Sequence, residues 1–276
     1  QLRARHLRRH PPVVTAMDLA ELRQWLLIYS AALPRLLLAL ATLPLLRRQV
    51  LPGLTRNAVI FILALSALPV AAAGLPATAP SNAWLFGILI KEAFIGLVIG
   101  YVTSVLFWAV EAIGFFIDNQ RGATMASSLN PLTEEQTSPL GILLSQVMTV
   151  LFFSGGGFLI YLGGIYQSYR LWPVASFYPR LDLDAAVFFL NQLDVLMYLT
   201  VFLAGPIIVA MFLVEFGMGL IGRFSPQLNV FFLAMPVKSG LANGLLVAYI
   251  AMLVYFFSAE FQRLSTLLPR LRSLLE

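Results

Sequence analysis

The sequence predicts an all-α, membrane-associated protein, and three observations support this prediction. Apolar residues make up 59% of the 276-residue chain and charged residues only 11%, and the mean hydropathy is +0.85. Soluble domains are nearer one quarter charged, so this composition is typical of membrane proteins. The apolar residues fall into long blocks that could supply roughly six or seven helical crossings of about 20 residues each. One helical domain is the simplest organisation.

The residues that most enzymes depend on are missing from the sequence. It has no cysteine, and its only histidines, His6 and His10, lie in a basic N-terminal arm. No GxSxG, HExxH or Walker-type motif occurs, and the Gly155–Gly157 run is better explained as a helix break. We therefore predict no catalytic residue, no metal site and no cofactor. The net charge of +5 comes from arginines near segment ends, which indicates membrane topology rather than nucleic-acid binding.

The N-terminal region combines a basic arm with an interrupted apolar block. Residues 1–20 are expected to be a retained arm, because no short apolar core with a small-residue cleavage site follows. The block Leu22–Leu46 is interrupted by Pro34 and Arg35 and is basic at both ends. A kinked helix, a re-entrant helix or a hairpin would accommodate this pattern. Arg35 is expected to pair, because charges inside a membrane pair or face water.

Two further apolar blocks precede a long polar segment. Ala58–Ala79 is uncharged and long enough to span a bilayer, and Pro69 and Pro76 are expected to kink or end it. Ala83–Ile117 is too long for one straight crossing, so it must tilt, bend or project beyond the bilayer.

The rest of the chain repeats this order of apolar and polar segments. Ser138 and Pro139 are expected to be the N-cap and the first residue of the next helix. The segments expected after them are a helix to about Leu162, a polar-aromatic connection (Gly163–Asp184), an overlong block (Ala185–Ile221), a second polar break (Gly222–Asn229), an apolar run (Val230–Pro236), and a helix from about Gly240 to Phe261. The domain boundaries are an arm at 1–20, one helical domain at 21–262 and an amphipathic tail at 263–276.

The polar segment Asp118–Pro131 is the most informative part of the sequence. Unpaired polar backbone at membrane depth is tolerated only inside protein or beside water, so this loop could line or close a pathway. Glu111, Asp118 and Arg121 fall near one helix face, and they either anchor the loop or pin a movable plug. Met125 is either an ordinary packed methionine or a deformable seal.

Other charged and small residues suggest contacts between helices. Lys91 and Glu92 are adjacent and therefore point to different helix faces, so we expect them not to neutralise each other. Each would either reach the headgroups or pair with a neighbouring subunit. The spacings Gly96/Gly100 and Gly240/Gly244 predict close helix packing, and a specific partner contact is left open.

Two blocks of the sequence, taken together, resemble the SctT/FliR family. The first contains Lys91-Glu92, Gly96, Gly100, Gly114, Ile117-Asp118-Asn119-Gln120-Arg121-Gly122, Met125-Ala126, Asn130-Pro131-Leu132 and Ser138-Pro139-Leu140-Gly141. The second contains Glu215, Gly222-Arg223, Pro226-Gln227-Leu228-Asn229-Val230 and Pro236-Val237-Lys238. Arg35 is similar to an arginine in the family's first segment. Within the first block, the sequences Asp118-Asn119-Gln120-Arg121-Gly122 and Ser138-Pro139-Leu140-Gly141 resemble injectisome members of the family more than flagellar members.

The resemblance implies an export-gate component of a type III secretion system, at the base of the complex in the bacterial inner membrane. In that family one copy closes a spiral of SctR/FliP-type and SctS/FliQ-type subunits, and an SctU/FlhB-type subunit is a further expected partner. The assembly passes unfolded protein substrates, and its kinked helical hairpins surround a hollow. The plug, about Gly114–Pro131, would contain Gly114, Asp118, Asn119, Gln120, Arg121, Gly122, Met125, Asn130 and Pro131. The charged residues expected in assembly or gating are Arg35, Lys91, Glu92, Glu111, Glu215, Arg223 and Lys238.

A secondary transporter for a small solute is the alternative function. In that case Arg35, Glu111 and Asp194 would line a midplane site. A proton relay through Glu111, Asp194 and Glu215 is less favoured, because no histidine or short chain of carboxylates supports it. Purification would discriminate between the two functions. A transporter should purify alone or as a homo-oligomer, whereas an export-gate component should co-purify with two other small membrane proteins.

Overall fold

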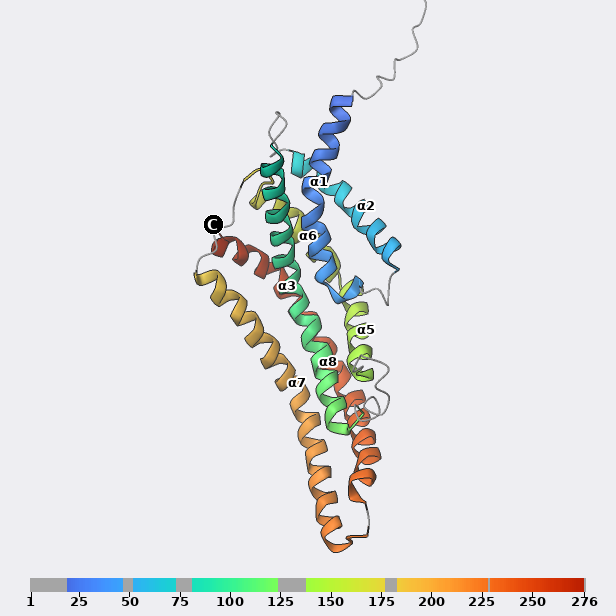
Figure 1. The fold of residues 1–276 in the computed structure, drawn as a ribbon. Coiled ribbons are helices and arrows are strands. Elements are labelled where there is room, and N and C mark those ends of the chain that lie inside the picture. The colour runs from blue at the N-terminus through green and yellow to red at the C-terminus, as the bar shows by residue number, and fades with distance from the viewer. Residues whose placement is uncertain are drawn as a thin grey trace, which may run out of the picture.

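The computed structural model is an elongated assembly of long helices (Figure 1). It describes residues 19–46, 52–72, 81–123, 138–176, 183–227 and 229–275, and these ranges contain no strand. The elements are α1 (Leu19–Thr42), η1 (Pro44–Leu46), α2 (Gly53–Ala72), α3 (Asn82–Arg121), α5 (Pro139–Ser154), α6 (Gly157–Leu171), α7 (Leu183–Phe224) and α8 (Val230–Leu275). The predicted all-α class is confirmed.

Helix α3 is the central element of the fold. It contacts α1, α5, α7 and α8 along its 40 residues. Its most apolar stretch is 72% buried inside the protein, against 22–39% for the equivalent stretches of α1, α2, α7 and α8. A helix that is apolar on all sides must be covered on all sides, and here the chain itself supplies most of the cover.

Helices α1 and α3 run in parallel and touch through glycines. A Cβ atom on Gly96 would overlap the backbone carbonyl of Arg35, and one on Gly100 would overlap Thr42. The predicted packing at Gly96 and Gly100 is therefore confirmed. Gly240 and Gly244 have no atom within 4 Å of a built Cβ, so they bring no described helices together. For these two glycines the packing prediction fails within this chain.

Helix α1 is continuous, and helix α6 lies against it through buried tyrosines. Pro34 lies inside α1, which is continuous from Leu19 to Thr42, so of the alternatives for this block the hairpin is not formed in these residues. The Tyr161 hydroxyl donates to the Ala39 carbonyl at 2.6 Å, and the Tyr169 hydroxyl donates to the Ala32 carbonyl at 2.7 Å. A buried tyrosine hydroxyl needs an acceptor, and these backbone carbonyls supply it.

Helices α5 and α6 are one apolar segment bent by 69°. The bend follows Ser154, and Gly156 has φ +75°, a conformation that favours glycine. The predicted helix break at Gly155–Gly157 is confirmed. The predicted helix end near Leu162 is wrong, because α6 continues to Leu171.

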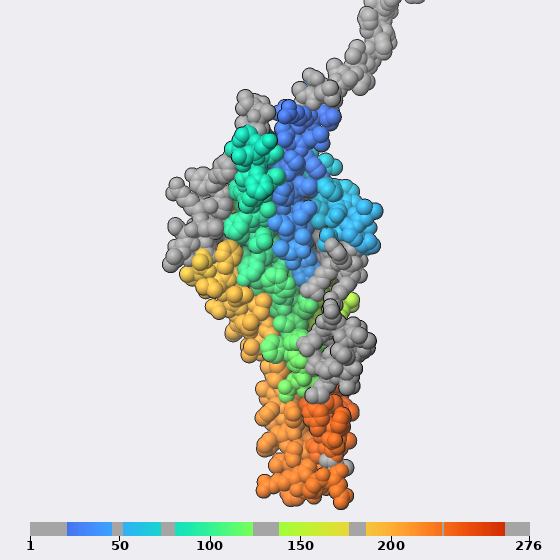
Figure 2. Space-filling view, in the orientation of Figure 1, coloured from blue at the N-terminus to red at the C-terminus, as the bar shows by residue number. Residues whose placement is uncertain are grey.

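Helices α7 and α8 form a hairpin longer than a bilayer is thick. They contain 42 and 46 residues and so extend about 63 and 69 Å, roughly twice the 30 Å hydrocarbon core. The predicted second break is shorter than expected, because α7 runs to Phe224 and Val230–Pro236 is the start of α8. Figures 1 and 2 show the tip of this hairpin projecting beyond α3 and α5. Among the described residues, five helices are long and apolar enough to cross a membrane, or six if the bent pair counts as one span.

Candidate functional site

The end of α3 differs from the sequence prediction. Residues 118–121, expected to open the polar loop, form the last turn of α3, and Gly122 caps the helix with φ +82°. The Ala123 N–H donates to the Asp118 carbonyl at 3.0 Å, which closes the last turn. The other predicted plug residues, Met125, Asn130 and Pro131, lie outside the described residues.

Asp118 connects the end of α3 to the beginning of α5. Its Oδ2 atom accepts hydrogen bonds from the Ser138 hydroxyl at 2.6 Å and the Leu140 N–H at 3.0 Å. Its Oδ1 atom forms an ion pair with the Arg121 guanidinium at 2.6 Å, as predicted for Asp118 and Arg121. Asp118 is fully buried. We call Asp118, Arg121, Ser138 and the Leu140 N–H the base clamp, because they join the two ends of residues 124–137.

Two glycines bring the α3 and α5 backbones into contact beside the base clamp. A Cβ atom on Gly114 would overlap the backbone of Gly141. A Cβ on Gly141 would lie 3.0 Å from the Glu111 carbonyl and 2.9 Å from the Ser138 hydroxyl. Ser138 is the N-cap of α5, with its hydroxyl accepting from the Gly141 N–H, and Pro139 follows it as predicted. This contact fixes the register of α5 against α3.

A buried charge network, Arg35, Lys91 and Glu92, joins α1 to α3. The Arg35 Nε and Nη2 atoms donate to the two Glu92 carboxylate oxygens at 2.6 and 2.8 Å, and both side chains are fully buried. This geometry confirms the expectation that Arg35 has a partner. The prediction that Lys91 and Glu92 do not neutralise each other is wrong, because the Lys91 Nζ lies 2.8 Å from Glu92 Oε1.

The network also holds the end of α6. The Lys91 ammonium donates to the carbonyls of Pro173, Val174 and Ser176 at 2.7–3.0 Å. Arg35 donates to the Ser168 hydroxyl at 3.0 Å and the Trp172 carbonyl at 2.9 Å. These carbonyls belong to the C-cap Trp172 and to the turn just after α6, where the negative end of the helix dipole also favours positive charge. Sequence reasoning missed these acceptors, because carbonyls carry no side-chain signal.

A third polar cluster, Gln120, Glu215 and Lys238, links α3 to the α7–α8 hairpin. Glu215 accepts from the Gln120 amide at 3.2 Å and from the Lys238 ammonium at 3.3 Å. Lys238 is buried, whereas the Glu215 side chain is 47% exposed. Arg223 is exposed. The structure thus pairs Glu215 with Lys238, whereas the Arg223 side chain is exposed near the end of α7.

Substitution of Glu215 by alanine should lower the yield of folded protein several-fold. It leaves the buried Lys238 ammonium without its ion-pair partner, which is costlier than losing the pair altogether. The double variant Glu215→Ala/Lys238→Met should recover part of the yield, because methionine removes the charge and keeps the length. Quantitative purification from membranes would measure both effects, with the exposed Asp194→Asn as control. Wild-type yield of Glu215→Ala would show that this cluster does not contribute to the packing of α7 and α8 on α3.

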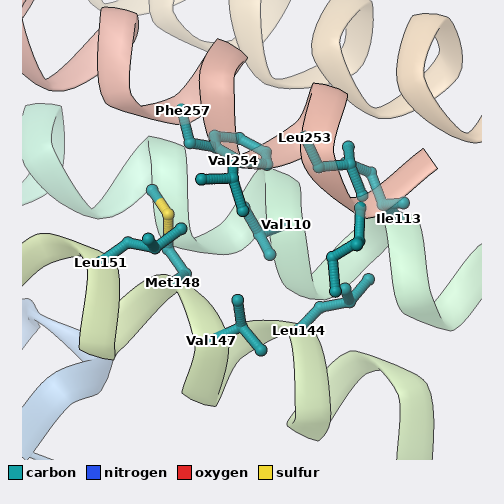
Figure 3. Close-up of a pocket in the computed structure, with 10 residues that line it drawn as sticks. Val110, Ile113, Leu144, Val147, Met148, Leu151, Leu253, Val254 and Phe257 are labelled. Atoms are coloured by element: carbon teal, nitrogen blue, oxygen red, sulfur yellow. The ribbon is translucent and has the colours of Figure 1, made fainter. Parts of the chain in front are cut away.

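An apolar cavity lies between α3, α5 and α8 (Figure 3). Its lining includes Val110 and Ile113 of α3, Leu144 and Met148 of α5, and Leu253 of α8. Every lining side chain is hydrophobic, so it offers no polar partner to a water molecule or a polar solute. The cavity lies at the three-helix junction and is unsuited to a polar solute.

The residues of the alternative transporter site do not come together. Arg35 pairs with Glu92, and Asp194 is exposed on α7. Glu111 lies 19 residues beyond Glu92 on the same helix, about 28 Å along its axis. The predicted midplane site of Arg35, Glu111 and Asp194 is therefore not formed.

These features define a helical membrane protein in which buried charges and backbone contacts fix α1, α5 and α6 against α3, and in which the base clamp joins the end of α3 to the start of α5. The chain belongs to the family described as bacterial export proteins, family 1, whose model matches residues 26–264. The resemblance to the SctT/FliR family is thereby confirmed.

Three relatives show how the similarity is distributed. Yop proteins translocation protein T of Yersinia pestis is 48% identical over 225 residues, covering 81% of this chain and 86% of that protein. Secretion system apparatus protein SsaT of Salmonella typhimurium is 34% identical over 222 residues, covering 79% and 85%. Flagellar biosynthetic protein FliR of Bacillus subtilis is 29% identical over 167 residues, covering 60% and 64%. Identity is thus higher to the translocation and secretion proteins than to the flagellar protein.

Proposed function

We propose that this chain is a core, channel-forming subunit of a type III secretion export gate in the bacterial inner membrane. In this proposal the segment after α3 helps to close the pore until an unfolded substrate displaces it. The observation that carries the proposal is that a member of an export family leaves α3 at Gly122 and re-enters helix at Ser138, and that the carboxylate of Asp118, in the last turn of α3, accepts a hydrogen bond from Ser138. A segment with adjoining ends can occupy a pore without being part of its wall.

The surface of the α7–α8 hairpin supports assembly with other subunits. Its apolar residues stay exposed along α7 and into the start of α8, far beyond the reach of a hydrocarbon layer about 30 Å thick. Those near the tip are Phe212, Leu213, Phe216, Leu220, Ile221, Phe224, Phe231, Phe232, Leu233 and Val237. Apolar surface that lipid cannot cover over its whole length needs protein cover. We propose SctR/FliP-type and SctS/FliQ-type subunits as that cover, with an SctU/FlhB-type subunit as a further partner.

The proposed gating requires no covalent reaction, only a change in which contacts are made. Moving a closure from 1% to 99% open requires about 5.5 kcal/mol of differential interaction. Contacts such as the half-exposed Glu215 with Gln120 are weak enough to be exchanged at that scale. The packed α3–α5 interface is too strong to be exchanged at that scale, because its glycine contacts leave the two helices no room to slide. Opening of the pore is therefore expected to move residues 124–137 and to leave the helices in place.

Replacement of residues 124–137 by a short glycine-serine linker should leave the complex assembled but leaky to small solutes. Asp118, Gly122 and Ser138 stay in this variant, so the helix contacts are kept. Conductance of membranes holding the complex would be measured beside the co-purification yield of the partner subunits. A glycine-serine replacement of equal length, as control, separates loss of bulk from loss of specific side chains. An assembled complex with unchanged conductance would contradict the proposed closure.

A further inference from the structure

We propose that the apolar cavity between α3, α5 and α8 binds the methyl end of a membrane-lipid acyl chain. Because every side chain that lines the cavity is hydrophobic, its ligand must be apolar. The opening of the cavity, its depth along the helices and its volume all fit the end of an acyl chain. This binding does not depend on the proposed closure of the pore by residues 124–137.

The cavity opens on the side where α5 and α8 lie next to each other. Its floor is buried, because Val110 and Ile113 of α3 are each at most 2% exposed. Its rim is accessible, because Val147 of α5 and Val254 of α8 are half-buried and Ile250 of α8 is 36% exposed. Figure 3 shows side chains of the three helices converging on this space. An apolar ligand can therefore reach the buried floor from outside, between α5 and α8.

The opening lies near the middle of an apolar span. The nearest charged residues along α8 are Lys238 and Glu260, and residues 239–259 carry no charge. As a helix this uncharged stretch extends about 31 Å, which matches the roughly 30 Å hydrocarbon core of a bilayer. Ile250 lies close to its midpoint, and Val147 lies close to the midpoint of α5. The methyl ends of lipid chains meet at the bilayer midplane, so they are the lipid atoms that reach this depth.

The volume of the cavity selects a small apolar group. The cavity measures about 20 Å³. A water molecule needs about 10–15 Å³ of such space, so there is room for about one methyl group and none for an aromatic ring. A methyl group in this position would gain dispersion contacts with α3, α5 and α8 at once. The lining also includes the buried Met148, whose flexible side chain can adapt to the shape of the bound chain.

Photolabelling by lipids tests this binding. The full-length protein, with the subunits that co-purify with it, is reconstituted into phosphatidylcholine bilayers. A small fraction of the lipid carries a diazirine near the methyl end of one acyl chain. This lipid should label residues 144–151 and 250–257 several-fold more than residues 195–202 of α7, which include more exposed apolar side chains. Phosphatidylcholine with the diazirine beside the ester group should show no such excess. Equal labelling of the cavity and α7 segments by the methyl-end lipid would overturn the proposal.

Variants of Val147 distinguish binding in the cavity from general contact with lipid. Val147→Phe fills the space and should lower the labelling several-fold, whereas Val147→Ala enlarges the space and should raise it. The matched controls are Val150→Phe and Val150→Ala, because Val150 lies about one turn further along α5 and is 66% exposed. The alanine pair keeps the test valid if Val147→Phe does not fold. Labelling that follows neither change at Val147 would contradict lipid binding in the cavity. Labelling that appears only after the partner subunits are removed would also overturn it, because a partner's side chain would then fill the cavity in the complex.

Discussion

Substitution of Glu92 by alanine should prevent stable packing of α1, α3 and α6, at a cost of about 3–5 kcal/mol, the range for removing one partner of a buried ion pair. Glu92 is the only acid in the buried network, and it contacts both Arg35 and Lys91. Its removal leaves two buried cations with only a serine hydroxyl and backbone carbonyls as acceptors. A change of this size is a large part of the stability of a typical domain.

Thermal unfolding of the detergent-purified protein and its yield from membranes would measure this effect. The matched control is Arg35→Met/Glu92→Leu, which removes the ion pair as a unit and leaves Lys91 with its three carbonyls. Hydrophobic replacement of a whole buried pair is often neutral, so the double variant should be more stable than Glu92→Ala. Equal stability of Glu92→Ala and wild type would show that the network contributes nothing to packing.

Substitution of Gly96 by alanine should have the second largest effect, with loss of folded protein. The new Cβ would overlap the backbone carbonyl of Arg35, and a helix backbone cannot rotate away as a side chain can. Overpacking typically costs about 1–3 kcal/mol, and a clash with backbone belongs at the upper end. Arg35 is itself held by Glu92, so a shift of α1 would also disturb the charge network.

Gly163→Ala is the control for this prediction, because Gly163 lies within α6 and has no atom within 4 Å of a built Cβ. Alanine in an open helical position should stabilise by about 0.5–1 kcal/mol. Gly240→Ala adds a third comparison. If its stability is unchanged but its partners no longer co-purify, Gly240 lies at a subunit contact. Thermal shifts that are equal for Gly96→Ala and Gly163→Ala would contradict the packing argument.

Local signals were predicted well, and contacts between distant segments were not. The Ser138-Pro139 helix start and the Gly155–Gly157 break depend on neighbouring residues, and the structure confirms both. Arg35 was expected to pair, but its partner lies 57 residues away and no local pattern identifies it. The polarity of residues 118–121 indicated a loop, yet tertiary hydrogen bonds from Ser138 and Leu140 stabilise Asp118 within the helix.

The errors at charged residues have a common physical cause. Adjacent helical positions diverge at the Cβ atoms, but the Lys91 side chain is long enough for its ammonium to return to Glu92. Helix ends at Leu162 and Phe261 were placed too early, because composition changes there while the backbone pattern continues in α6 and α8. The base clamp could be predicted only in part: its Asp118–Arg121 pair is local, and its Ser138 contact is not.

The central place of α3 also bears on how the chain is made. Ribosomes add roughly 5–20 residues per second, and the α8 residues that cover α3 extend to Phe257. On the order of ten seconds therefore separates the synthesis of α3 from that of its last cover. During that interval the sides of α3 that α5, α7 and α8 cover in the folded chain stay bare, and only the α1 side is covered. Translation at the membrane, with lipid or an insertion factor as a temporary shield, is the setting in which such a chain escapes aggregation.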